Sequence, residues 1–191
     1  MQRLGLFGGS FDPVHCGHLL VAQAACEELE LGRLFFIPAA QSPFKPGTVP
    51  APAGERLRLL RLALAGRTRC EIDDQELARR GASFTIETAR DYGRRFPEAE
   101  LYYLIGADHV AQLPQWREAE ELARRLQFVV VPRPGETLPA PPPPFRLRVL
   151  RGFPLAVSSS QIRARVRAGD GIDGLVPAAV AEAIHNYRLY L

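Results

Sequence analysis

Short apolar runs alternate with longer amphipathic stretches along almost the whole chain. The runs predict strands at Arg3–Phe7, Leu34–Ile37, Cys70–Ile72, Leu101–Ile105, Phe128–Val131 and Leu147–Leu150. The longer stretches predict helices at Gly17–Leu29, Ala53–Ala65, Thr85–Phe96, Trp116–Arg125, Ser159–Ala168 and Pro177–Leu191. This alternation is typical of a parallel sheet with helices on both faces. We therefore expect an α/β fold, a Rossmann-like doubly wound parallel sheet, as a single domain over 1–191 with a small C-terminal helical region at about 157–191.

The turn after the first strand carries the most informative side chains. A strand, a glycine turn and a helix N-terminus present backbone N–H groups that bind phosphate. His15 and His18 stand at the start of the helix in H-x-G-H spacing, and their ring N–H groups would add donors for a polyphosphate whose charge shifts during reaction. Gly17 between them permits a close approach of backbone or ligand. Ligands of such sheets bind beyond the carboxyl ends of the strands, which is where this turn would lie.

Other interpretations of this turn are weaker. It has neither the G-x-G-x-x-G spacing of a dinucleotide fingerprint nor the G-x-x-x-x-G-K-S/T pattern of a P-loop. Two nearby histidines without a third ligand are weak evidence for a metal, so we predict no metal site. The remaining alternative is a structural or solvated role for the two histidines.

A second candidate anion site lies near the end of the chain. Ser158 and Gln161 have the spacing of a capping box, which predicts that a helix begins there. The free amides and hydroxyls of Ser158 and Ser159, together with Arg163 one turn later, would bind an anion. The alternative is simple capping by one of the serines, with Arg163 in solvent.

Composition narrows the classes of partner. A net charge of +3, from 24 basic and 21 acidic residues, is too mild to indicate nucleic acid but suits an anionic small molecule. Three cysteines without a C-x-x-C pair indicate neither a disulfide framework nor a zinc site. No apolar run approaches the ~18 residues of a membrane span, so we expect no membrane contact and a cytoplasmic protein. Lys45 is the single lysine and lies in a proline-rich loop over Pro38–Pro52.

The motifs together resemble a known family. The pattern G-x-F-x-P-x-H-x-G-H near the N-terminus, with S-S-x-x-I-R near the C-terminus, is similar to the nucleotidylyltransferase superfamily related to class I aminoacyl-tRNA synthetases. Within it, the chain resembles the bacterial nicotinate-nucleotide adenylyltransferases nearly from end to end. The blocks that carry this finer resemblance are Gly8–Pro13, Glu76–Arg79 with Gly81 and Ser83–Thr85, Leu104–Asp108, Leu113–Trp116 and Val131–Gly135.

The resemblance implies transfer of AMP from ATP to nicotinate mononucleotide with Mg²⁺, giving deamido-NAD and pyrophosphate. The acceptor phosphate would attack the α-phosphorus in line without a protein nucleophile, so catalysis would consist of positioning and charge neutralisation. By motif position, His15, His18, Lys45 and Arg163 are the catalytic candidates, with Lys45 bridging the phosphates of both substrates. The ATP site would also include Gly8, Gly9, Ser10, Phe11, Gly106, Asp108, Ser158 and Ser159.

The same resemblance implies which residues bind the acceptor, nicotinate mononucleotide. Trp116 would stack on the pyridine ring, and the amides near Thr85 and Arg117 would receive its carboxylate. Two alternatives stay open: Trp116 as an ordinary core residue, and Asp108 as merely the N-cap of the following segment. The chain departs from the usual family pattern at Phe44, where a histidine is common, and at Arg117, where an aromatic residue is common.

Three other functions compete with this hypothesis. A phosphopantetheine adenylyltransferase shares both end motifs but is usually shorter and lacks the Leu-Pro-x-Trp and Arg-Pro-Gly blocks. A non-catalytic nucleotide sensor would be favoured by loss of a motif histidine or of Lys45, and all are present. A tRNA-binding module needs a basic face or an appended domain. The preference between nicotinate and nicotinamide mononucleotide, and any homo-oligomer, are left open by the sequence.

Overall fold

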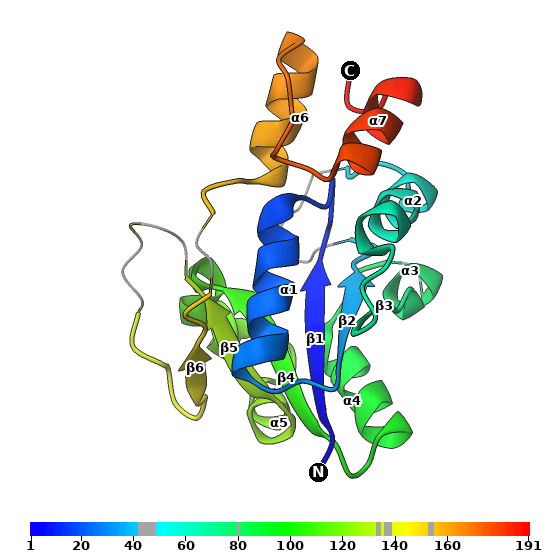
Figure 1. Ribbon diagram of the computed structural model, residues 1–191. Coiled ribbons are helices and arrows are strands. Elements are labelled where there is room, and N and C mark those ends of the chain that lie inside the picture. The colour runs from blue at the N-terminus through cyan, green and yellow to red at the C-terminus, as the bar shows by residue number, and fades with distance from the viewer. Residues whose placement is uncertain (42–48, 80, 133–134, 136–138, 153–154) are drawn as a thin grey trace.

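The computed structural model describes residues 1–191 except 42–48, 80, 133–134, 136–138 and 153–154. Its described residues form a six-stranded sheet in the order β3-β2-β1-β4-β5-β6, with every pairing parallel (Figure 1). This order puts the switch point between β1 and β4, where open α/β sheets bind ligands. The strands are β1 (Arg3–Gly9), β2 (Arg33–Pro38), β3 (Cys70–Ile72), β4 (Glu100–Gly106), β5 (Gln127–Val131) and β6 (Leu147–Val149).

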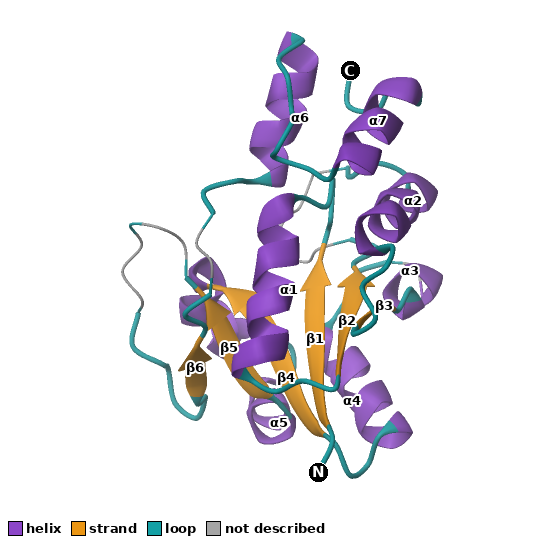
Figure 2. Cartoon of the chain, in the orientation of Figure 1, coloured by secondary structure: helices purple, strands orange, loops and turns teal. Residues whose placement is uncertain are grey.

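Helices cover both faces of the sheet (Figure 2). Helix α1 lies against one face, while α4 and α5 lie against the other (Figure 1). Each face has its own apolar core: Leu59 and Val180 belong to the first, and Ile86 and Leu122 to the second, all with no exposed surface. The helices are α1 (Cys16–Glu28), α2 (Ala53–Leu64), α3 (Gln75–Arg79), α4 (Thr85–Arg95), α5 (Ala119–Arg125), α6 (Ser159–Ala168) and α7 (Ala178–Asn186), with a 3₁₀ helix η1 (Ala107–Gln115).

The predicted fold class is confirmed, and each predicted strand ends within a residue or two of its observed bounds. The helix predicted over Trp116–Arg125 begins too early. Trp116 is extended, Glu118 has a left-handed backbone with φ 55°, and α5 starts at Ala119. The helix predicted over Pro177–Leu191 runs too far, because left-handed residues Arg188 and Tyr190 follow its end at Asn186. Helices α3 and η1 were not predicted, since one is very short and the other lacks a 3.6-residue period.

The turn after β1 and the C-terminal helical region meet at the carboxyl edge of the sheet. Helices α6 and α7 lie beyond the strand ends in Figure 1. The Cys16 amide donates to the Leu175 carbonyl at 2.9 Å, and Ser159 Oγ donates to the Pro13 carbonyl at 2.8 Å. The turn that carries the histidines is therefore held against the serine cluster. Within the described residues, no helix has the length and apolar character needed to cross a bilayer.

Candidate functional site

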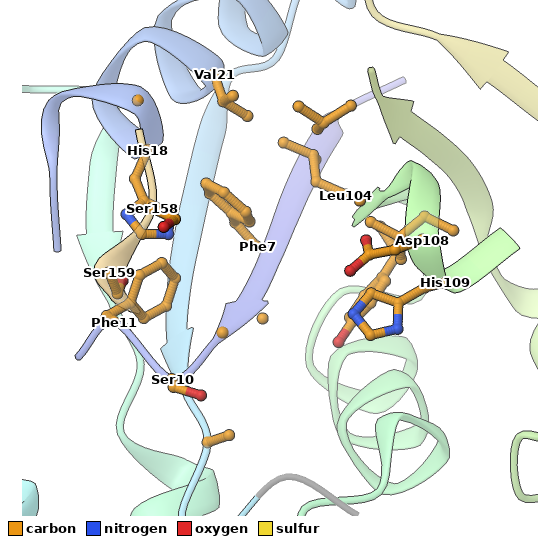
Figure 3. Close-up of a pocket in the computed structure, with 18 of the residues that line it drawn as sticks. Phe7, Ser10, Phe11, His18, Val21, Leu104, Asp108, His109, Ser158 and Ser159 are labelled. Atoms are coloured by element: carbon orange, nitrogen blue, oxygen red, sulfur yellow. The ribbon is translucent and has the colours of Figure 1, made fainter. Parts of the chain in front are cut away.

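A cavity of about 900 Å³ opens at the carboxyl ends of β1 and β4. Figure 3 shows His18, Ser158 and Ser159 on one side, Asp108 and His109 on the other, and Phe7 and Leu104 between them. We call the first side the histidine wall and the second the tryptophan wall. The histidine wall consists of His15, His18, Ser158, Ser159 and Arg163. The tryptophan wall consists of Thr85, Tyr103, Asp108, His109, Trp116 and Arg117.

His15 and His18 cap helix α1 reciprocally. The His18 amide donates to His15 Nδ1 at 3.4 Å, and the His15 amide donates to His18 Nδ1 at 3.2 Å. The two rings stack with centroids 3.7 Å apart. Because each Nδ1 accepts a hydrogen bond, the neutral form of each ring carries its proton on Nε2. The capping geometry therefore places the Nε2–H of each ring away from the capping hydrogen bonds at the N-terminus of α1.

Electrostatics keep the His18 imidazole neutral. Burial lowers the pKa of His18 well below its usual range, and the neighbouring His15 lowers this pKa further. A neutral ring with a fixed tautomer donates one directed hydrogen bond, and it adds no charge to its surroundings before a ligand binds.

Gly17 is required for this arrangement. A Cβ at Gly17 would lie 2.9 Å from Cγ1 of Val157 and 3.1 Å from the His15 ring. Any larger residue would therefore displace either the capping histidine or the segment that leads into α6. The sequence predicted a close approach at this glycine, and the structure identifies Val157 and His15 as the groups that approach it.

Helix α6 supplies the rest of the histidine wall. Ser158 is its N-cap and accepts from the Gln161 amide at 3.2 Å, which confirms the predicted helix start. Arg163 reaches back across the site: its Nη1 donates to the Asp12 carbonyl at 2.6 Å and lies 3.8 Å from Asp12 Oδ2. The alternative of a solvated Arg163 is wrong, since only 22% of its side chain is exposed.

Two buried charges that the sequence analysis gave no role hold this wall from behind. Asp12 is buried, and its Oδ1 accepts from the Ala51 amide at 3.3 Å. Arg56, also buried, donates to the Ser10 carbonyl at 2.8 Å and the Ala39 carbonyl at 2.9 Å. Burial lowers the pKa of Arg56, and nearby Asp12 partly offsets this. Asp12 lies within the Gly8–Pro13 block that carries part of the family resemblance. Nothing in the sequence distinguishes Arg56 from the other arginines on helices.

Trp116 belongs both to the core and to the cavity. It is 9% exposed and meets Tyr103, Phe128 and His109 edge-to-face with ring centroids 6.1–6.2 Å apart. Trp116 is thus a core residue, as the alternative interpretation holds, and it also lines the cavity. Its position is fixed by three aromatic neighbours, which prepares it to meet a flat ligand ring without first being ordered.

Within the tryptophan wall, Tyr103 is joined to the start of α4. Thr85 Oγ1 donates to the Tyr103 hydroxyl at 3.3 Å. A Cβ on Gly8 would lie 2.4 Å from that hydroxyl, so a larger residue at this point of β1 would displace the Tyr103 side chain. Burial raises the pKa of Tyr103, and the Glu76 carboxylate raises it further. Tyr103 therefore stays a neutral phenol in the tryptophan wall, and it was not among the predicted site residues.

Asp108 lies in the first turn of η1 and on the cavity. The N-cap of that helix is Gly106, so the alternative of Asp108 as an N-cap is wrong. A Cβ on Gly106 would lie 2.4 Å from Asp108 Oδ1, so a larger residue there would displace the Asp108 carboxylate. His109 follows Asp108 on the same wall and was not among the predicted site residues (Figure 3).

Glu76 is a second lining residue without a predicted role. It is 5% exposed, and its Oε1 accepts from Thr88 Oγ1 at 2.7 Å. Burial raises the pKa of Glu76, while hydrogen bonds from Thr88 and Ser83 oppose that rise. Glu76 thereby braces the turn that leads into α4. The only indication of Glu76 in the sequence is its position in the Glu76–Arg79 block, which carries part of the family resemblance.

Two further predictions concern the loop that carries Lys45 and the binding of a metal. Lys45 and the adjacent Phe44 lie outside the described residues, so their predicted contacts stay predictions. Among the described residues, no group of three or more histidine, cysteine, aspartate or glutamate side chains is placed to hold a metal. The structure therefore brings together the predicted His15, His18, Ser158, Ser159 and Arg163 on one wall, and Thr85, Asp108, Trp116 and Arg117 on the other.

Comparisons with known proteins agree with this architecture. The cytidylyltransferase-like family matches residues 6–165. The probable nicotinate-nucleotide adenylyltransferase of Opitutus terrae is 42% identical over 191 residues, covering 99% of this chain and 98% of the relative. That of Geobacillus thermodenitrificans is 40% identical, covering 100% and 87%.

A solved structure shows the same fold at low identity. The Plasmodium falciparum nicotinic acid mononucleotide adenylyltransferase, complexed with NaAD, matches with a TM-score of 0.81 at 16% identity, over 100% of this chain and 98% of that one. The identity of the bacterial relatives over the full length carries the family assignment, and the structural match supports the fold. With its paired histidines and its serine–arginine helix facing an aromatic wall, the chain belongs to the nicotinate-nucleotide adenylyltransferase family within the cytidylyltransferase-like proteins.

Proposed function

We propose that this protein transfers AMP from ATP to nicotinate mononucleotide, forming deamido-NAD and pyrophosphate as a step of NAD biosynthesis. The observation that carries the proposal is the reciprocal capping of His15 and His18, which orients two Nε2–H donors beside the N-termini of α1 and α6. Directed donors of this kind suit a reaction that needs charge neutralisation more than proton transfer. The names of the bacterial relatives support the same reaction.

ATP would bind along the histidine wall. The turn over Gly8–Phe11 and the first amides of α1 would cradle the phosphates. Arg163 and the amides after Ser158 and Ser159 would hold the β- and γ-phosphates. Gly106 and Asp108 would lie against the ribose and adenine, across the switch point of the sheet.

The reaction needs no nucleophile from the protein. A phosphate oxygen of the acceptor attacks the α-phosphorus of ATP, a new P–O bond forms, and the bond between the α-phosphorus and the bridging oxygen of pyrophosphate breaks. Negative charge shifts toward the leaving pyrophosphate as that bond breaks. His18 donates from Nε2 toward this charge while remaining neutral, and Arg163 offsets the charge that accumulates. Lys45 would bridge the phosphates of the two substrates.

The acceptor would bind at the tryptophan wall. Trp116 would stack on the pyridine ring, and backbone amides at Thr85 and Arg117 would receive the carboxylate. Thr85 is the first residue of α4, whose free amides and helix dipole favour an anion. Mg²⁺ would arrive with ATP as part of the substrate.

The test is pyrophosphate release from ATP and Mg²⁺ with one of three acceptors: nicotinate mononucleotide, nicotinamide mononucleotide or phosphopantetheine. We expect strong release with the first and weak release with the second. Comparable rates with both pyridine nucleotides would keep the reaction and overturn the acceptor preference. Release only with phosphopantetheine would move the chain to the sister activity, and ATP binding without release would favour a sensor.

A further inference from the structure

We propose that the side chain of Arg117 is a positioning residue for the acceptor. Together with Glu87, it fixes the backbone around Trp116 and Arg117 relative to the N-terminus of α4. The inference rests on the proposed function, which assigns these two backbone segments to the acceptor carboxylate. It concerns a position where the chain has arginine in place of the aromatic residue that is common in the family.

Arg117 contacts the first turn of α4 at two points. Its Nη1 lies 3.4 Å from Glu87 Oε1, and its guanidinium lies over the Phe84 ring, 4.9 Å from the centroid. Phe84 is the N-cap of α4, and Glu87 lies in its first turn. The guanidinium stacks on an aromatic face and pairs with a carboxylate, two interactions that arginine makes together and lysine makes poorly. The side chain thus spans the gap between the two proposed carboxylate-binding segments.

Glu87 is itself anchored on its other side. Its Oε2 lies 3.2 Å from Arg79 Nη1, so the two oxygens serve two arginines. Arg79 also donates to Thr88 Oγ1 at 3.1 Å, and Thr88 in turn donates to the buried Glu76. The exposed contact between Arg117 and Glu87 is thereby connected, through Arg79 and Thr88, to the buried carboxylate of Glu76.

This geometry separates two roles for Arg117. If the guanidinium bound the acceptor carboxylate directly, Glu87 would compete for it, and removing the charge of Glu87 would strengthen acceptor binding. If Arg117 acts by positioning, removing that charge releases the contact and weakens acceptor binding. The two roles therefore predict opposite signs for the same substitution.

The experiment compares wild type with Glu87→Gln, Arg117→Gln and the double variant. Arg124→Gln is the matched control, because Arg124 is 70% exposed and pairs with Glu120 at 4.0 Å on α5. Steady-state assays give kcat and the KM of each substrate. Trp116 is the single tryptophan, so its fluorescence also reports direct titration with nicotinate mononucleotide in the absence of ATP. Melting temperatures detect general unfolding.

We expect Glu87→Gln to raise the acceptor KM about two- to fivefold, as for loss of a half-exposed ion pair. Arg117→Gln should raise it about three- to tenfold, because the aromatic contact is lost as well. The double variant should be no worse than Arg117→Gln alone. The KM of ATP and the melting temperature should stay close to wild type, and Arg124→Gln should resemble wild type throughout.

An unchanged or lower acceptor KM in Glu87→Gln would overturn the positioning role, and so would equal changes in both KM values. These outcomes differ from failure of the proposed function. Wild-type protein that neither turns over nicotinate mononucleotide nor changes its fluorescence with it would overturn both proposals. An active wild type with insensitive variants would overturn the positioning role alone.

Discussion

The two walls of the cavity are built by different means. The histidine wall is held by hydrogen bonds among groups with little exposure: side chains are 22% exposed at Arg163 and 8% at Asp12. The rim of the tryptophan wall is held by Arg117 and Glu87, whose side chains are 53% and 38% exposed. Buried polar bonds are costly to break, whereas exposed ion pairs contribute little. Substitutions in the histidine wall should therefore have large effects, and those at the opposite rim should tune binding.

Removal of the His18 ring should produce the largest effect. In His18→Ala, turnover should fall by ~10² or more, as expected when a donor to developing charge is lost. The fold should persist, because the lost cap is one of several contacts that hold α1. The measurement is kcat for pyrophosphate release together with a circular dichroism spectrum.

The control for this prediction is His185→Ala, an exposed histidine in the last turn of α7. It should keep wild-type turnover. A His18→Ala protein that also keeps near-full activity would contradict the role of the histidine wall in charge stabilisation.

Arg163 should rank second. In Arg163→Ala, the KM of ATP should rise about 10- to 100-fold, the range for losing a charged hydrogen-bonding group. The KM of the acceptor should change less, because Arg163 belongs to the histidine wall. Arg167→Ala, exposed on the same helix, provides the matched control. Equal rises in both KM values would show that the two walls do not divide the substrates between them.

The same contrast explains how much could be predicted from the sequence. The strands and the histidine wall were predictable because their signals are local: buried runs, a glycine turn, and the serine cap of α6. Asp12 and Arg163 are far apart in the sequence, and only the fold shows that Arg163 bonds back to the Asp12 carbonyl. The supports of the histidine wall thus depend on tertiary packing that no local pattern encodes.

The tryptophan wall was less predictable for the same physical reason. Its residues come from α4, β4, η1 and the segment between η1 and α5, and the 3₁₀ helix lacks the spacing that identifies an α-helix. Trp116 was therefore assigned to the start of a helix, whereas it is extended between η1 and α5. Tyr103 and Glu76 gain their roles only through contacts with residues distant in the sequence, at Thr85 and Thr88.

The low pKa of His18 makes stability depend on pH. In the unfolded chain this histidine binds a proton below about pH 6.5, whereas in the folded protein it stays neutral to lower pH. The unfolded state therefore gains protons first, and the free energy of unfolding falls as the pH drops below 6.5. The contribution from His18 has a maximum slope of about 1.4 kcal/mol per pH unit.

Chemical denaturation at pH 7.5 and pH 5.5 checks this, with His18→Gln as the reference that keeps a polar side chain but cannot titrate. Wild type should lose more stability over this interval than the variant. Equal losses would mean that His18 protonates as freely in the folded protein as in the unfolded chain, and the neutral donor assigned to it would be wrong.

Trp116 should give a smaller effect than His18 or Arg163, and it gives the sharpest test of the comparison. Trp116→Phe keeps an aromatic ring among Tyr103, Phe128 and His109 but reduces the surface offered to the pyridine. The acceptor KM should rise about three- to tenfold, the range of an aromatic stacking contribution, and the KM of ATP should stay unchanged. Steady-state kinetics with each substrate varied in turn separates the two constants. An acceptor KM equal to wild type, with a lower melting temperature, would make Trp116 a core residue alone, and the acceptor would then have to bind elsewhere on the tryptophan wall.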